Sequence, residues 1–323
     1  MALDWFVLFH KAHRRSSSFN IPLLLLSLTH FFPPHTIQTE QMKGIHERLF
    51  LPPPSPPSTE LFIVGDVHGC VKELETMVDM IKRHTTTLEP PLIFMVGDLV
   101  NKGPSSVDTI RYCRENNIRT VIGNHDLAAL NRVDDEDDKE GTKYEWLQYL
   151  DAADIEYLRK APWSISIWSS MGDPPFPLLT IVHAGLVPGK SLEDQTLKDL
   201  TEVRLIRPVG GGGWKAFYPP KNGPPQDGDA PSPSPSPSDL KSWNEVYSST
   251  SPAQPLIVYG HDAKIGFKQT SNTVGLDSGC CYGNCLTAVK VSLASSSILD
   301  LSFFKVDAER VYSQPGKTFS EIT

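Results

Sequence analysis

Asp66 and His68 stand two residues apart in the Gly-Asp-Val-His-Gly stretch 65–69, directly after the apolar run 61–64. A strand that opens into a loop here could turn both side chains toward one cation, because the flanking glycines let the backbone bend sharply. An Asp-x-His pair beside glycine also occurs in ordinary turns. The stretch therefore indicates a metal site only together with further ligands.

Four further apolar runs end at residues that can bind metal or exchange protons. They are 92–96 before Gly97-Asp98, 119–122 before Gly123-Asn124-His125-Asp126, 178–182 before His183-Ala184-Gly185, and 256–259 before Gly260-His261-Asp262. Short runs rich in β-branched residues are typical of strands. Because ligands of open α/β sheets bind at the carboxyl ends of strands, we expect the five loops to meet at one edge.

The candidate ligands combine carboxylate, amide and imidazole groups and include no sulfur. They are Asp66, His68, Asp98, Asn124, His183 and His261. Such a set suits Mn, Fe or Zn, and six ligands exceed what one catalytic ion with open positions needs. We therefore expect two divalent ions bridged by Asp98, one held by Asp66 and His68 and the other by Asn124, His183 and His261.

The apolar spacing between these loops predicts helices that cover a sheet. The three- and four-residue intervals of an amphipathic helix are kept by Val71, Leu74, Met77, Val78 and Ile81. A second helix is expected with Pro104 in its first turn, and residues 144–160 also predict helix. Two later runs, 285–292 and 298–306, are expected to complete a sheet.

The composition indicates one large domain with tails. Of 323 residues, 39% are apolar and 21% charged, and we expect a catalytic domain over residues 60–306 and a C-terminal tail over 307–323. The stretch 210–238, with four consecutive glycines and a Pro-Ser alternation, predicts an inserted surface loop. The acidic run 134–140 predicts a solvated loop, because like charges repel.

Charge and cysteine content narrow the partners and the metal chemistry. The net charge of −8 gives no DNA-binding signature, so an anionic substrate would be attracted locally by cations at the site. The odd number of cysteines, five, without a C-x-x-C pair argues against a disulfide framework or a thiolate zinc site and predicts reduced, mostly buried thiols. The oligomeric state is not indicated by the sequence.

Residues 1–59 show no strand or helix pattern that would join the core. Basic residues precede the apolar run 21–28 as in a targeting signal, but the run is shorter than the about 20 residues that span a bilayer. Two interpretations stay open, a disordered tail or a targeting or anchoring segment within residues 1–35. The first predicts a cytoplasmic protein, and the second a membrane-associated or organellar one.

In order, these motifs resemble those of the calcineurin-like metallophosphoesterases over residues 60–306. The Gly-Leu-Asp-Ser-Gly-Cys-Cys-Tyr-Gly stretch 275–283 makes the chain most similar to the branch with symmetrical bis(5'-nucleosyl)-tetraphosphatase and eukaryotic ApaH-like and endopolyphosphatase-type phosphatases. The resemblance implies an α/β fold in which a β-sandwich of two mixed sheets is flanked by helices, in four αββα layers. It also implies the dimetal centre above, with His125 as general acid.

Asn101-Lys102 departs from the Asp-Arg that most protein phosphatases of this superfamily carry. That Asp would raise the pKa of the acid His, and the Arg would grip phosphate in a bidentate fork. Asn101 can still orient His125 but leaves less imidazolium, which matters least when the leaving group is a phosphate. We therefore expect hydrolysis of phosphoanhydrides, either dinucleoside polyphosphates or inorganic polyphosphate, by in-line attack of a water activated by the two ions.

Two other functions remain as alternatives, a serine/threonine protein phosphatase and a non-catalytic binding module. Competent side chains at all six ligand positions argue against the second. Phosphate-binding candidates are Lys102, Arg204, Arg207 and Lys264, of which the last three are equally compatible with plain surface charges.

Overall fold

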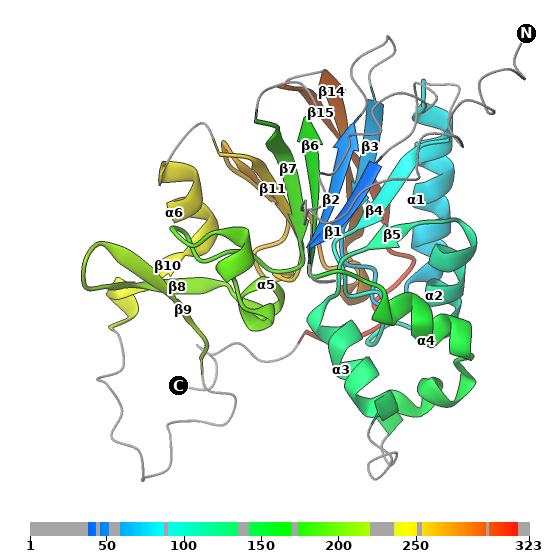
Figure 1. The fold of residues 1–323 in the computed structure, drawn as a ribbon. Coiled ribbons are helices and arrows are strands. Elements are labelled where there is room, and N and C mark those ends of the chain that lie inside the picture. Colours follow the sequence, from blue (N-terminus) through cyan, green and yellow to red (C-terminus); the bar gives the residue numbers. More distant parts are fainter. Residues whose placement is uncertain are drawn as a thin grey trace, which may run out of the picture. The chain divides into compact units, whose positions relative to one another are not determined.

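Two β-sheets face each other across a buried apolar layer, and helices cover their outer faces (Figure 1). The computed structural model describes residues 38–42, 46–51, 59–86, 90–134, 142–169, 174–219, 236–250, 254–294 and 297–315. All of them belong to one unit, residues 37–323. This is the layered α/β sandwich that the family resemblance implies.

The first sheet has five strands in the order β15-β14-β3-β4-β5. Their bounds are β3 (Thr59–Val64), β4 (Leu92–Met95), β5 (Arg119–Thr120), β14 (Cys285–Ala294) and β15 (Ser297–Asp307). β3, β4 and β5 run parallel, whereas β14 is antiparallel to both β3 and β15. The parallel steps bring the ends of β3, β4 and β5, and the loops that follow them, to one edge.

The second sheet has seven strands in the order β1-β2-β6-β7-β11-β13-β12. Their bounds are β1 (Gln38–Met42), β2 (His46–Leu51), β6 (Ser164–Ser169), β7 (Phe176–Val182), β11 (Leu256–Tyr259), β12 (Lys268–Gln269) and β13 (Thr273–Gly275). β7 and β11 are parallel neighbours, so the loops after Val182 and Tyr259 also share an edge. β6 and β7 are antiparallel, which makes this sheet mixed as well.

Helices form the two outer layers. The first sheet is covered by α1 (Val71–His84), α2 (Ser106–Glu115), α3 (Asn124–Asp134), the 3-10 helix η1 (Thr142–Tyr149) and α4 (Ala152–Arg159). Against the second lie α5 (Leu197–Glu202), α6 (Trp243–Thr250) and a small sheet of β10 (Lys241–Ser242), β8 (Leu205–Val209) and β9 (Gly213–Phe217). Short 3-10 turns are η2 (Leu192–Asp194), η3 (Pro237–Asp239) and η4 (Cys280–Tyr282).

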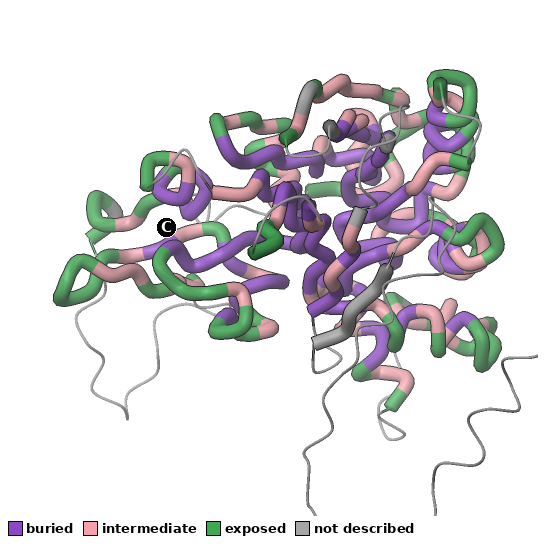
Figure 2. Tube along the Cα trace, turned by 45° about the horizontal axis from the view of Figure 1, so that its top comes forward, coloured by how far each residue is buried: buried purple, intermediate pink, exposed green. Residues whose placement is uncertain are grey.

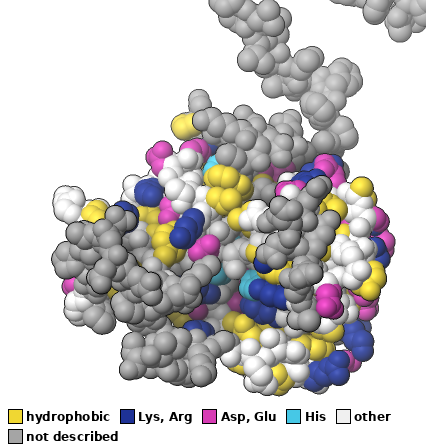
Figure 3. Space-filling model, turned by 90° about the horizontal axis from the view of Figure 1, so that it is seen from below, with side chains coloured by type: hydrophobic (Ala, Val, Ile, Leu, Met, Phe, Trp, Pro, Cys, Tyr) yellow, Lys and Arg dark blue, Asp and Glu magenta, His cyan; other side chains and the backbone are white. Residues whose placement is uncertain are grey.

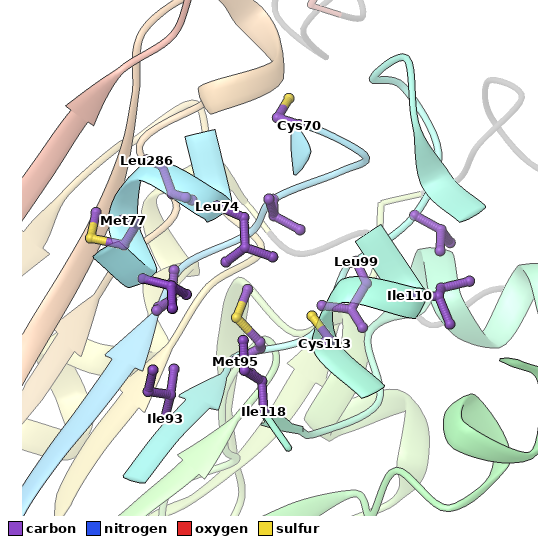
Figure 4. Close-up of a cluster of buried hydrophobic side chains, with 14 of the residues drawn as sticks. Cys70, Leu74, Met77, Ile93, Met95, Leu99, Ile110, Cys113, Ile118 and Leu286 are labelled. Atoms are coloured by element: carbon purple, nitrogen blue, oxygen red, sulfur yellow. The ribbon is translucent and has the colours of Figure 1, made fainter. Parts of the chain in front are cut away.

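Strand β3 shows how the layers are held. Its Leu61 and Ile63 belong to the cluster between the sheets, while Phe62 and Val64 belong to the cluster beneath the helices, and all four are fully buried. Burial of such a side chain stabilises the fold by about 1.5–3 kcal/mol. The buried strands form the interior in Figure 2. Figure 4 shows Leu74 and Met77 of α1 in the cluster beneath the helices, as the helical spacing predicts.

The prediction that residues 1–59 contribute nothing to the core is wrong for β2. This strand pairs in parallel with β6 over residues 46–51, and Leu49 is buried between the sheets. Its sequence carries His46, Glu47 and Arg48 in succession, so it lacks the apolar alternation that predicts a strand. Residues 1–35, with the proposed targeting segment, lie outside the described residues. Among the residues that the structure describes, no helix is long and apolar enough to cross a bilayer.

Three other boundaries differ from the sequence prediction. The glycine run 210–213 does not open a surface loop but makes the turn of the β8–β9 hairpin, with φ of 84° and 81° at Gly211 and Gly212. Residues 220–235 and the acidic residues 135–140 lie outside the described part. Pro104 precedes α2, whose N-cap is Ser105. The C-terminal segment is docked as far as Ser313, which donates a backbone hydrogen bond to Cys281.

Candidate metal centre

Asp98 lies between two histidines that come from different sheets. Its Oδ2 atom is 3.5 Å from Nε2 of His68, and its Oδ1 atom is 3.4 Å from Nε2 of His183. Because the two oxygens face different histidines, one carboxylate can serve two cations. This arrangement is the one that a bridging carboxylate requires, and the bridge itself stays a prediction.

The remaining predicted ligands complete the two groups. Oδ2 of Asp66 is 4.0 Å from Nε2 of His68. On the other side, Oδ1 of Asn124 and Nδ1 of His261 lie 3.0 and 3.2 Å from Nε2 of His183. All six side chains are therefore brought to one place, and their division between two ions stays a prediction.

In the space-filling view of Figure 3, histidine side chains lie beside lysine or arginine side chains near the middle of the face. Ligand atoms of Asp98, His183 and His261 lie within 4.8 Å of one another, and so do those of His68, Asp98 and His125. Two neighbouring sets of mixed oxygen and nitrogen donors fit two divalent cations.

Hydrogen bonds to the backbone orient two of the predicted histidine ligands. Nδ1 of His68 is 3.0 Å from the carbonyl oxygen of Val100, and Nδ1 of His183 is 2.8 Å from that of Val96. A carbonyl only accepts, so both Nδ1 atoms carry a proton, and both Nε2 atoms are directed toward Asp98. Metal-binding histidines are commonly oriented in this way.

The backbone at the site adopts left-handed conformations that non-glycine residues rarely use. Among the described residues, six non-glycine residues have positive φ: His68, Asp98, Asn101, Lys102, Asn117 and His261. Five of the six belong to the predicted site, and each costs about 1–2 kcal/mol. Strain of this kind clusters at functional sites, where the surrounding fold imposes it.

Two glycines allow the ligand loops to approach each other. A Cβ atom at Gly260 would lie 1.9 Å from Oδ1 of Asp66, and one at Gly123 would lie 2.3 Å from Oδ1 of Asp98. No side chain can fit at either position without displacing a predicted ligand. The glycines of these motifs are thus explained by contact as well as by bending.

Sequence reasoning assigned no role to two buried carboxylates, Asp126 and Asp277. Asp126 accepts the backbone N–H groups of Asp98, Leu99 and Gly123, and so ties the loop after β4 to the loop after β5. Burial, reinforced by Asp98, raises the pKa of Asp126 to about 7. Asp126 directly follows Asn124-His125, and this position in the motif is the sequence feature from which its role could have been predicted.

The carboxylates make the site strongly attractive to cations. Burial, then Asp277 and Asp98, raises the pKa of Asp66 well above its usual range. Burial also raises the pKa of Asp277 to about 6. Asp98 is different, because the adjacent His183 outweighs burial and holds its pKa well below the usual range. Divalent ions would offset the repulsion among these groups.

The family model for calcineurin-like phosphoesterases matches residues 60–272. The chain belongs to this family. It is 27% identical over 272 residues to a symmetrical bis(5'-nucleosyl)-tetraphosphatase of Erwinia tasmaniensis, covering 71% of this chain and 93% of the relative. A Yersinia enterocolitica protein of the same name is 28% identical over 294 residues, covering 77% and 93%.

Among solved structures, a candidate diadenosine tetraphosphatase superposes with a TM-score of 0.58 at 24% identity, covering 81% of this chain and 97% of that one. This likeness supports the fold. The family membership makes the protein a hydrolase of phosphoric esters or anhydrides, as the sequence motifs indicate.

Two of the phosphate-binding candidates, Lys102 and Arg204, lie beside the predicted metal ligands of the phosphoesterase. Nζ of Lys102 donates to Nε2 of His68 at 2.8 Å and lies 5.4 Å from the ring centre of Tyr282, a neighbour that sequence reasoning missed. Although burial opposes it, Asp98 raises the pKa of Lys102 and keeps it cationic. Arg204 donates to the carbonyl oxygen of His261 at 2.9 Å.

The other two phosphate-binding candidates are not brought to these ligands in the described structure. Arg207 lies on strand β8, and Lys264 is exposed in the turn that follows Asp262. Their suggested role stays a prediction from the sequence.

The predicted acid His125 lies beside the ligands at the start of α3. Its backbone N–H donates to Oδ1 of Asp98 at 2.8 Å, and its ring meets that of His68 edge to face, with centroids 4.9 Å apart. Burial is the largest of the effects that lower the pKa of His125 to about 4. The phosphoesterase therefore holds this imidazole neutral near pH 7.

Proposed function

We propose that the protein hydrolyses phosphoanhydride bonds of dinucleoside polyphosphates, with two divalent ions of Mn, Fe or Zn held by the six ligands. Inorganic polyphosphate is the other anhydride substrate compatible with the site. The relatives named as symmetrical bis(5'-nucleosyl)-tetraphosphatases support the first choice, since the match spans 93% of their length.

Bound at Asp98, two divalent ions would supply a nucleophile from water at neutral pH and neutralise charge on the phosphoryl oxygens. The chain itself positions the other groups. Lys102, held cationic by Asp98, can bind a phosphate oxygen on the side of His68. His125 lies within reach of the same centre and can hold a proton for the departing oxygen.

The observation that carries the substrate class is the amide of Asn101 beside His125. Nδ2 of Asn101 lies 3.4 Å from Nδ1 of His125 and 3.3 Å from its carbonyl oxygen. An amide N–H can only donate, so Nδ1 accepts and the proton of the neutral ring is on Nε2. A neutral imidazole is a weak acid, which suffices for a phosphate leaving group and serves a serine alkoxide poorly.

A substrate panel tests the proposal. We would measure kcat/KM with Mn²⁺ for diadenosine tetraphosphate, inorganic polyphosphate, a phosphoserine peptide and an aryl phosphate. We expect the dinucleotide to exceed the phosphopeptide by at least about tenfold, a difference of about 1.4 kcal/mol in the barrier. Chromatography of the nucleotide products would show which anhydride bond is cut.

Asp98→Asn is the matched control, because it preserves shape while removing the charge of the predicted bridge. Activity that stays at the wild-type level after this change would come from a contaminant. A higher kcat/KM for the phosphopeptide than for either anhydride would favour the protein phosphatase alternative.

A further inference from the structure

Cys70, Glu73 and Cys280 form a buried cluster that shares no residue with the predicted catalytic ligands. Their sulfur and carboxylate atoms lie within 4.8 Å of one another, and none of the three residues is more than 3% exposed. Cys70 is the N-cap of α1, Glu73 lies in the first turn of that helix, and Cys280 begins η4. Two separate loops thus meet at two thiols and one carboxylate.

Only one of the two carboxylate oxygens of Glu73 has hydrogen-bond partners. Its Oε1 atom accepts the backbone N–H of Glu309 at 2.9 Å and the hydroxyl of Tyr312 at 2.8 Å. Its Oε2 atom is buried and has no hydrogen-bond partner. A buried carboxylate oxygen without a donor or a cation is costly. None of the described residues supplies that partner to Oε2.

The thiols could be explained without a ligand, as a pair in the apolar core. Cys280 is hydrogen-bonded to Cys70, and this contact together with burial raises the pKa of Cys280. That explanation leaves Oε2 of Glu73 without a partner. Packing of the two thiols in the apolar cluster therefore does not account for this carboxylate oxygen.

We propose that Cys70, Glu73 and Cys280 bind a structural zinc ion that is distinct from the ions at Asp98. Thiolates select Zn²⁺ or Cu⁺, and the carboxylate favours Zn²⁺ of the two. On binding, each thiol loses its proton to solvent, so two thiolates and one carboxylate oxygen hold the ion. The ion would supply the positive partner that Oε2 of Glu73 lacks.

Such an ion would join three segments near the catalytic ligands. Cys70 stands two positions after His68, Cys280 stands three positions after Asp277, and Glu73 anchors the C-terminal segment through Tyr312. The site is buried, so we expect the ion to be acquired during folding and to exchange slowly.

Cobalt substitution tests this proposal without using activity. Thiolate ligands give Co²⁺ an intense charge-transfer absorption in the near ultraviolet, and the predicted catalytic ligands contain no sulfur. Protein produced in cobalt-supplemented, zinc-depleted medium should show this band. We expect Cys70→Ser and Cys280→Ser to lose it, and protein from zinc-replete medium should contain one zinc ion more per chain than Cys280→Ser.

The controls separate this ion from the catalytic ones. Cys113→Ser, at a buried thiol outside the cluster, and Asp98→Asn, at the predicted bridge, should both keep the band. Folded wild-type protein that carries cobalt but lacks the band would overturn the proposal, whether or not the serine variants fold. Loss of the band in Cys281→Ser, with retention in Cys280→Ser, would overturn the ligand assignment.

Discussion

The indole N–H of Trp146 donates to Oδ1 of Asn101 at 3.2 Å and so fixes which end of that amide faces His125. With the oxygen engaged by the indole, the amide nitrogen lies toward Nδ1 and the carbonyl oxygen of His125. The tautomer of the predicted acid is therefore set by a residue of η1, which lies 45 positions from Asn101 in the chain.

Asn101→Asp should shift the substrate preference toward phosphoserine peptides. A carboxylate accepts from Nδ1 and favours the imidazolium, so the pKa of His125 should rise from its lowered value of about 4. Activity that needs the protonated acid is lost as pH rises through this pKa, so the alkaline limb of the pH profile should move upward. The measurement is the phosphopeptide-to-dinucleotide ratio of kcat/KM across pH.

A new charge near the cations can lower all rates, so the ratio and not the absolute rate decides. Lys82→Gln, an exposed charge change in the last turn of α1, is the control. An unchanged ratio with an unmoved alkaline limb would mean that Asn101 does not tune His125.

Trp146→Phe should lower kcat by about 2- to 10-fold with little change in KM, because one hydrogen bond that orients Asn101 is worth about 0.5–1.5 kcal/mol. The ring stays apolar and aromatic, so packing is largely kept. In the Asn101→Asp background the second change should have a different effect, since the residues act together. Additive effects in this double-mutant cycle would rule out the orienting role.

The convergence of the candidate ligands could be predicted because each of their motifs stands at the end of an apolar strand beside glycine. Asp98 and His183 illustrate this, since their strands belong to different sheets and still end at one edge. Short-range spacing was sufficient because parallel strands bring their carboxyl ends together.

The residues that support the ligands could not be predicted in this way. Trp146 reaches Asn101 from a 3-10 helix, and nothing in its local sequence distinguishes it from a core tryptophan. Strand β2 was missed for a related reason, because its polar sequence becomes a strand only through pairing with β6, more than 100 positions later. Both depend on contacts between distant segments, which local periodicity does not report.

Asp98→Asn should leave the protein folded and lower kcat by about 10³-fold or more, because the variant loses the charge expected to bridge two cations. Chelation of the wild type should abolish turnover, and Mn²⁺ should restore it. Titration of chelated protein with Mn²⁺ should show full activity only at two ions per chain bound at this centre. Full activity with one ion there would contradict the dimetal assignment.

Asp277→Asn should stabilise the chelated protein increasingly as pH rises. Burial raises the pKa of Asp277 to about 6, from an ordinary value of 3.8. Between these values the native state binds more protons than the unfolded state, so ionisation of Asp277 removes stability as pH rises through this window. Over about two pH units the cost approaches about 3 kcal/mol, and asparagine avoids it while its amide oxygen can still accept from Gly279.

The free energies of unfolding of the two proteins should be measured by denaturant titration at pH 4 and pH 7 with chelator present. Saturating Mn²⁺ should reduce the advantage of the variant, because bound cations favour the ionised carboxylate. A stability difference that does not change between pH 4 and pH 7 would show that Asp277 ionises in the folded protein as readily as in the unfolded chain.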